Sequence, residues 1–146
     1  MTGYPTSDDR NSYWTVRAQN GRSCRSGDKI GNKDIVRLQH LTTGKYLHSH
    51  IVPAPMSQGE HEVSAFEDRG RGDSGDNWRV DTAQGDVWKR GEKVRLVHSD
   101  TKRSLATHKR YFQHPIPGQQ EVIATASKGT NTYWHTREGI YFPVNA

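Results

Sequence analysis

Two histidines separated by a single residue are the first candidates for chemistry. His48 and His50 flank Ser49, and in an extended strand residues two apart point to the same face. Two imidazoles on one face could begin a metal site, which would need further ligands. A later segment of the same pattern has Ala106 in place of the first histidine. The sequence therefore favours hydrogen-bonding histidines near a turn, and no metal or other cofactor is expected.

Glu62 and Glu121 could be imagined as the carboxylate pair of a glycoside hydrolase. Each follows the pattern Gly-x-x, and the two occupy equivalent positions of two repeated segments. We expect them to lie far apart, each accepting backbone N–H groups. The chain has no nucleophile beside a base, no phosphate-binding loop and no dinucleotide-binding turn. The sequence therefore predicts a protein that is not an enzyme.

Aromatic side chains beside hydrogen-bonding groups are better candidates for ligand binding. Tyr46 and His48 follow the turn residue Gly44, and an exposed ring next to polar groups suits carbohydrate or peptide. Tyr111 and Phe112 lie in a loop bounded by prolines and could offer an apolar contact to a partner protein. With His50, these residues form the predicted ligand-binding or partner-binding set.

The elements that must position these residues come from an internal repeat. Segment 36–50, VRLQHLTTGKYLHSH, returns without a gap 58 residues later as 94–108, VRLVHSDTKRSLATH. Trp78 and Trp134 follow the two copies, and Trp14 marks the tail of an earlier copy whose beginning would precede Met1. A period above fifty residues is typical of repeat architectures. The recurrence of tryptophan at one repeat position favours packing in the core, whereas Trp88 has Cys24 as its equivalent and is the tryptophan least expected to be buried.

Alternating apolar residues predict short strands and no helix longer than a turn. The strands are expected at 14–17, 36–40, 46–48, 62–66, 78–80, 87–88, 94–98, 104–107, 121–124, 133–136 and 140–142. Runs rich in Gly, Pro, Asp and charge predict loops at 1–11, 19–34 and 51–59, and a solvent-exposed loop at 69–77.

Such repeats cannot bury their apolar faces alone, which favours an all-β barrel, the β-trefoil. We expect one domain over 1–146: the tail of repeat one and a linker (1–34), repeat two (35–92) and repeat three (93–146). With the first repeat incomplete at the N-terminus, the barrel would be gapped and have unpaired edges.

Composition excludes several classes of partner. The 21 Lys and Arg are interspersed with 16 Asp and Glu, giving a formal charge of +5, so the surface is mixed and no nucleic-acid partner is expected. No apolar run approaches the roughly 18 residues of a membrane span. Cys24 is the single cysteine, so no intrachain disulfide forms within these residues. The N-terminal MTGYPTSDD has neither the basic region nor the apolar core of a signal peptide.

The repeated residues resemble the MIR motif of protein O-mannosyltransferases and of inositol trisphosphate and ryanodine receptors. The order of VRLQHLTTGKYLHSH, PMSQGEHEVSAF, GDSGDNW, PIPGQQEV, NTYW and REGIYFPVN is similar to the stromal cell-derived factor 2 family over essentially the whole chain. The chain departs from that pattern by lacking a signal peptide, the first part of repeat one and a retention signal. It also has Leu105-Ala106-Thr107-His108 where the family has Leu-His-Ser-His.

The resemblance implies a non-catalytic adaptor of the endoplasmic reticulum lumen that works in secretory protein folding and quality control. Its implied partners are a J-domain co-chaperone and the luminal Hsp70, with unfolded polypeptide or glycan as further ligands. The alternative is a lectin-like module for mannose-type glycans, as in the mannosyltransferases. A third interpretation is a fragment with no function of its own.

Overall fold

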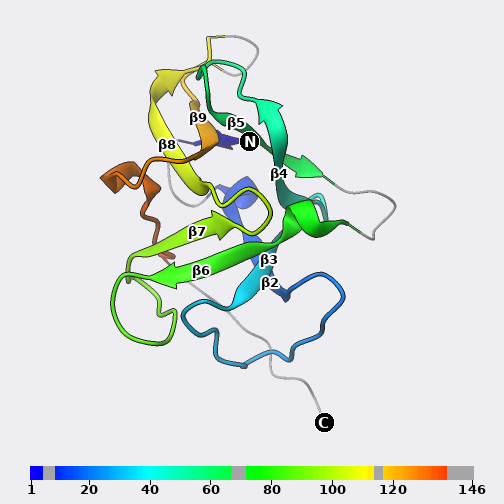
Figure 1. The fold of residues 1–146 in the computed structure, drawn as a ribbon. Coiled ribbons are helices and arrows are strands. Elements are labelled where there is room, and N and C mark those ends of the chain that lie inside the picture. The colour runs from blue at the N-terminus through cyan, green and yellow to red at the C-terminus, as the bar shows by residue number, and fades with distance from the viewer. Residues whose placement is uncertain (5–8, 67–71, 114–116, 138–146) are drawn as a thin grey trace.

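The computed structural model describes residues 1–4, 9–66, 72–113 and 117–137, and this part of the chain is all-β with three single-turn 3-10 helices. Figure 1 shows the strands wrapped around a common core. The strands are β1 (Thr2–Gly3), β2 (Trp14–Ala18), β3 (Ile35–His40), β4 (Tyr46–Pro53), β5 (His61–Phe66), β6 (Trp78–Thr82), β7 (Val94–His98), β8 (Ser104–Tyr111) and β9 (Gln120–Thr125). The helical turns are η1 (Arg10–Ser12), η2 (Ser74–Asp76) and η3 (Thr130–Thr132). The prediction of an all-β chain without long helices is confirmed over the described residues.

The strand pairings close into a ring. The order β9-β5-β4-β3-β6-β7-β8 returns to β9, which pairs with both β5 and β8. Strand β1 adds to β9, and β2 adds to β3. Among the described strands, β1 and β2 each have a partner on one side only. Because neighbouring pairs are antiparallel, short turns suffice to join them.

The predicted hairpin at 36–48 recurs in the structure with the same turn. In the first copy the His40 amide donates to the Lys45 carbonyl at 2.7 Å, and in the second the His98 amide donates to the Arg103 carbonyl at 2.7 Å. Gly44 has φ of 73°, and Lys102, which occupies the equivalent position in the second copy, has φ of 61°. The left-handed conformation therefore belongs to the turn itself, and glycine adopts it with the least strain.

The three helical turns repeat as well, each ending two residues before a tryptophan. His40 Nε2 lies 2.8 Å from the carbonyl oxygen of Asn11 in η1, and His98 Nε2 lies 2.8 Å from that of Gly75 in η2. The imidazole of each hairpin thus satisfies a carbonyl of the preceding turn, a buried polar group that would otherwise be costly. The rings of Trp78 and His98 meet edge to face, with their centroids 4.8 Å apart.

The tryptophans pack in or against the core, as the sequence predicted. Trp78 is fully buried, and its Nε1 donates to the Leu47 carbonyl at 3.0 Å. Trp134 makes the same bond to Leu105 at 2.8 Å. Partly buried side chains, including Trp14, Trp88 and Trp134, pack against a core of Val36, Leu47, Val63, Trp78, Val80, Val94, Leu96, Leu105, Val122 and Ala124. The burial of Trp88 is a finding that its lone position in the repeat did not predict.

Several predicted boundaries are wrong. Residues 1–11 hold β1 and part of η1, because the chain near Gly3 pairs with Gln120 at the edge of β9. Strand β4 continues through the predicted loop to Pro53, where its pairing with β5 resumes beyond a bulge. The predicted strand at 87–88 is reduced to a single bridge from Val87 to Gly31.

The structure also differs from the predictions made for residues 133–136 and 69–77. At 133–136 the structure has one bridge, from Trp134 to Val94, in place of a strand. The predicted strand at 140–142 lies outside the described residues. The expected solvent loop at 69–77 contains η2, in which Gly75 and Asp76 are buried, because this turn packs beneath β4. No helix among the described residues is long and apolar enough to span a membrane.

Candidate functional site

The first candidate site lies along β4, whose first four residues are buried and whose last four are exposed. Tyr46 is buried at the start of this strand, with the Arg37 guanidinium 4.6 Å from its ring centroid. The expectation of an exposed Tyr46 ring is therefore wrong, because the ring is covered by Arg37. A ring covered in this way cannot stack on an external ligand.

His48 is buried against a carboxylate that the sequence reasoning missed. Its Nδ1 lies 2.8 Å from Oδ1 of Asp76, which is fully buried. The ring of Phe66 lies 4.7 Å from the His48 ring. Asp76 Oδ2 accepts the amide of Asp73 at 3.0 Å, completing a capping box around η2. The spacing Asp73-x-x-Asp76 ahead of Trp78 is the signal that could have predicted this cap.

His50 and Asp73 extend this arrangement to the surface. His50 Nε2 lies 3.7 Å from Asp73 Oδ2, and His48 Nδ1 lies 3.6 Å from Asp73 Oδ1. One donor atom of each residue lies within 4.8 Å of the others. We call His48, His50 and Asp73 the β4 cluster. Two imidazoles and a carboxylate at these distances could hold a divalent cation.

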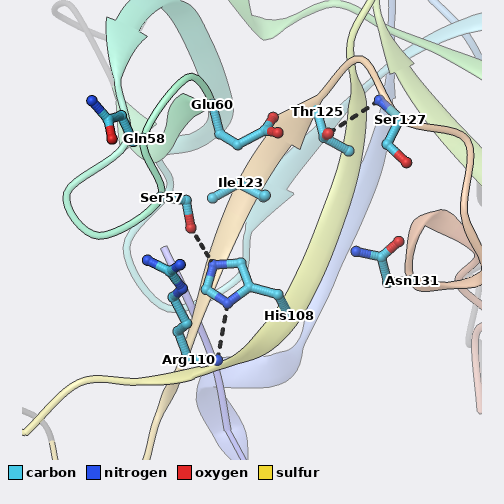
Figure 2. Close-up of a pocket in the computed structure, with 9 residues that line it drawn as sticks. All are labelled: Ser57, Gln58, Glu60, His108, Arg110, Ile123, Thr125, Ser127 and Asn131. Atoms are coloured by element: carbon cyan, nitrogen blue, oxygen red, sulfur yellow. Dashed lines mark hydrogen bonds between the residues drawn. The ribbon is translucent and has the colours of Figure 1, made fainter.

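The second candidate site is a pocket of about 360 Å³ on β8, β9 and the loop that follows β4 (Figure 2). Figure 2 shows the His108 ring between Ser57 and Arg110, close to the floor formed by Ile123. Apart from Ile123, the residues that line it carry polar side chains: Ser57, Gln58, Glu60, His108, Arg110, Thr125, Ser127 and Asn131. The sequence reasoning did not select this pocket, because its two walls come from different repeats.

A Ser–His–Glu network lies at the edge of this pocket, yet its geometry is not that of a catalytic triad. Ser57 Oγ donates to Glu121 Oε1 at 2.6 Å, and His108 Nε2 lies 2.8 Å from the same oxygen. The Arg110 amide donates to His108 Nδ1 at 2.9 Å. Nδ1 is therefore an acceptor, so the proton is on Nε2, the nitrogen that faces Ser57 at 2.5 Å. The imidazole has no free lone pair toward the hydroxyl and cannot act as its base.

Glu121 is an ionised acceptor in this network. Burial by itself would raise the pKa of Glu121, but hydrogen bonds from Ser57, His108 and the Met56 amide outweigh it and hold the pKa below its ordinary value. The Met56 amide donates at 2.7 Å. The expectation that this glutamate accepts a backbone N–H is confirmed.

The expected wide separation of Glu62 and Glu121 is wrong. Strands β5 and β9 pair directly, and the register sets Glu62 opposite Ile123, two residues from Glu121. Their proximity still provides no glycosidase pair, because Ser57, His108 and the Met56 amide occupy the Glu121 oxygens.

The third candidate site is a pocket of about 440 Å³ at the end of β8. Tyr111 is 52% exposed there, and its hydroxyl accepts a hydrogen bond from Gln120 Nε2 at 3.1 Å. Tyr4 and Trp134 also line the pocket, and neither was predicted to do so. Phe112 is half-buried beside it and does not line it. Aromatic rings of this kind can stack on a sugar or hold a peptide side chain.

The predicted set therefore divides between two places. Tyr46, His48 and His50 lie on β4, whereas Tyr111 ends β8 and Phe112 follows it.

Comparisons with known proteins place the chain in a family. The model of the MIR domain matches residues 1–84. A stromal cell-derived factor 2-like protein of Dictyostelium discoideum is 46% identical over 143 residues, which are 97% of this chain and 67% of that protein. Human stromal cell-derived factor 2 is 40% identical over 97% of this chain and 66% of its own length.

Comparison with solved structures agrees with this family assignment. The crystal structure of the stromal cell-derived factor 2-like protein from Arabidopsis thaliana superposes with a TM-score of 0.91 at 39% identity, covering 99% of this chain and 80% of that one. A protein O-mannosyltransferase complex of S. cerevisiae bound to its sugar donor superposes at 0.81 with 29% identity, over 92% of this chain and 20% of that one. The chain spans about two thirds of the length of the curated relatives it matches. It belongs to the stromal cell-derived factor 2 family of MIR-domain proteins.

Proposed function

We propose that this chain is a non-catalytic adaptor of the endoplasmic reticulum lumen. It binds a J-domain co-chaperone that works with the luminal Hsp70, and it takes part in folding and quality control of secretory proteins, including contact with client polypeptides. Family membership supports the compartment. The observation that carries the non-catalytic part is the His108 ring, whose Nδ1 accepts the Arg110 amide and which therefore cannot activate Ser57.

We further propose that the chain folds as a β-trefoil with repeats at 35–92 and 93–146 and the tail of another repeat and a linker at 1–34. The recurring bonds support this division. Trp78 and Trp134 donate to leucine carbonyls of their own repeats, and His40 and His98 each contact the turn of the preceding repeat.

The partner-binding face in this proposal is the pocket at the end of β8. Tyr4 and Tyr111 are both 52% exposed, and Trp134 lies between the pocket and the core. Exposed aromatic rings bury a large apolar area on contact and retain a polar group for hydrogen bonding. They therefore suit an apolar stretch of a co-chaperone or an unfolded client.

A pulldown with immobilised J-domain co-chaperone tests both the adaptor role and the choice of binding face. Wild-type chain should be retained, and Tyr111→Ala should be retained less. Tyr13→Ala is the matched control, because Tyr13 is 48% exposed and lies before β2, outside this pocket. Failure to retain the wild-type chain above the bead background would refute the adaptor proposal. Equal retention of both variants would refute the choice of face.

The alternative function, a lectin-like module for mannose-type glycans, is favoured by one specific observation. The fold superposes on part of a mannosyltransferase complex bound to a sugar donor, and Trp134 lines an aromatic pocket in this chain. Titration with mannose oligosaccharides should change the tryptophan fluorescence in the wild type and leave that of Trp134→Phe unchanged. An unchanged wild-type spectrum, together with no binding on a glycan array, would eliminate this alternative.

A further inference from the structure

The β4 cluster brings two imidazoles and a carboxylate together, and its Asp73 also caps η2. We propose that His48, His50 and Asp73 bind a single divalent cation of the zinc class. The sequence did not predict this site, because the third ligand comes from the turn before η2 and is 23 residues from the nearer histidine in the chain.

The distances between the three side chains are close to those around a small cation. Around a tetrahedral zinc ion with bonds of about 2.0–2.1 Å, ligand atoms lie roughly 3.3 Å from one another. The His48–Asp73 and His50–Asp73 atom pairs are 3.6 and 3.7 Å apart. The two histidines approach different oxygens of Asp73, so the exposed side chains of His50 and Asp73 would rotate to bring one oxygen and both imidazoles around a common ion. The two imidazole rings meet edge to face with centroids 4.1 Å apart.

The ligand chemistry selects among cations. Two imidazoles and one carboxylate suit zinc, and also nickel or copper, whereas magnesium and calcium prefer oxygen ligands. Three protein ligands would leave a fourth position for water or for a group of a bound partner. His50 and Asp73 are about half exposed in their side chains, at 49% and 46%, so the site is accessible from solvent.

The surroundings hold two of the ligands in place. In the metal-free protein Asp76 Oδ1 contacts His48 Nδ1 and Asp76 Oδ2 accepts the Asp73 amide, so one carboxylate positions both an imidazole and the loop that carries the third ligand. A cation bound to His48 Nδ1 would replace the first of these two contacts. Gly75 makes room, since a Cβ at this position would lie 2.5 Å from His48 Cε1 and 2.9 Å from His50 Cε1.

Repeat three shows that the fold does not require these side chains. It forms the equivalent turn η3 and the equivalent strand β8, yet it has Ala106 and Gly129 where repeat two has His48 and Asp73. Thr132 replaces Asp76. The equivalent of His50 is His108, which is engaged by Glu121. The full ligand set is thus specific to repeat two, as expected for a binding function superimposed on a shared scaffold.

The test is direct metal binding by the full chain. Zinc chloride is titrated against a chromophoric chelator in competition with the protein, and cobalt chloride supplies a visible absorption band that reports coordination geometry. We expect one ion per chain. His50→Ala removes an exposed ligand. Asp73→Asn removes the negative charge but keeps a side-chain oxygen that can still accept the Gly75 amide and cap η2. His135→Ala is the control, because His135 is an exposed histidine outside the cluster.

Each ligand variant should bind zinc at least about tenfold more weakly, the lower end of the loss produced even by outer-shell changes, and should melt at the wild-type temperature without metal. His135→Ala should bind as the wild type does. The proposal is overturned if the wild type binds no stoichiometric zinc. It is also overturned if His50→Ala and Asp73→Asn keep full affinity, or if His135→Ala loses as much affinity as they do.

Discussion

Glu121 connects β9 to the loop after β4 and to β8, and replacing it with glutamine should destabilise the protein in a pH-dependent way. Its carboxylate accepts three hydrogen bonds, from Ser57 Oγ, His108 Nε2 and the Met56 amide. Two of these donors belong to the loop after β4 and one to β8. Glutamine has the same shape but only one acceptor oxygen, so its NH₂ group must face at least one of these donors. A buried donor left without a partner costs about 1–3 kcal/mol, and bonds to a charged acceptor are worth more than bonds to a neutral one. We therefore expect Glu121→Gln to lower the free energy of unfolding by about 2–3 kcal/mol at pH 7.

The sign of the pH dependence follows from the lowered pKa of Glu121. A carboxyl group whose pKa is lower in the folded than in the unfolded protein stabilises the fold above its ordinary pKa of 4.5. That stabilisation is lost as pH falls through the folded value, because the carboxylate then becomes protonated. The difference in unfolding free energy between the wild type and Glu121→Gln should therefore be largest above pH 4.5 and decrease below it.

Urea unfolding followed by tryptophan fluorescence at a series of pH values measures this difference. Glu62→Gln is the matched control, since Glu62 occupies the equivalent repeat position and its carboxylate makes no hydrogen bond within the part of the chain that is described. The control should change stability by no more than about 0.5 kcal/mol. A Glu121→Gln variant as stable as the wild type at pH 7 would refute the reasoning. A loss of stability that stays constant from pH 7 to pH 3 would show that the charge of Glu121 does not contribute.

Three further substitutions check the core, the turn beneath β4 and the proposed binding face. Leu47→Ala should lower the unfolding free energy by about 2–5 kcal/mol, because Leu47 is 1% exposed. Leu41→Ala, at a 61% exposed site, should cost no more than about 0.5 kcal/mol in the same urea titration, and similar losses at both sites would contradict the assigned core. Gly75→Ala should destabilise by about 1–3 kcal/mol in thermal unfolding, since its Cβ would come within 2.5 Å of His48; an unchanged melting temperature would mean that the β4 cluster is less closely packed than described. Tyr111→Ala should leave the melting temperature within about 2 °C of the wild type while reducing co-chaperone retention, and a large loss of stability would assign Tyr111 a structural role.

Local sequence signals predicted the elements that depend on local physics. Alternating apolar residues around Gly44 and Lys102 predicted two hairpins, because a turn and its flanking strands are contiguous in the chain. The repeated position of Trp78 and Trp134 predicted their packing, because equivalent residues in a repeat fold meet equivalent neighbours. The boundaries that failed, such as the continuation of β4 to Pro53, depend on pairing with a strand from elsewhere.

The candidate sites could be predicted only in part. Tyr111 is exposed, but it ends strand β8 where the sequence predicted a loop bounded by prolines. Tyr46 was misjudged, because the sequence does not reveal that the Arg37 guanidinium covers its ring. The sequence indicated that His48 and His50 lie on one face of a strand. It could not predict their carboxylate partners, because these depend on how η2 packs against β4.

The sequence by itself therefore determined the repeat period, the hairpins, the all-β class and the packing of Trp78 and Trp134, because each is encoded by spacing along the chain. Only the tertiary structure decided the environment of each polar side chain. His50 and His108 are equivalent in sequence, yet one reaches Asp73 and the other Glu121. The carboxylate partners of His48 and His108, which are Asp76 and Glu121, lie 28 and 13 residues away in the chain. Repeats that share a backbone pattern pack against different neighbours, and those neighbours decide whether a histidine binds a carbonyl, a carboxylate or a ligand from solvent.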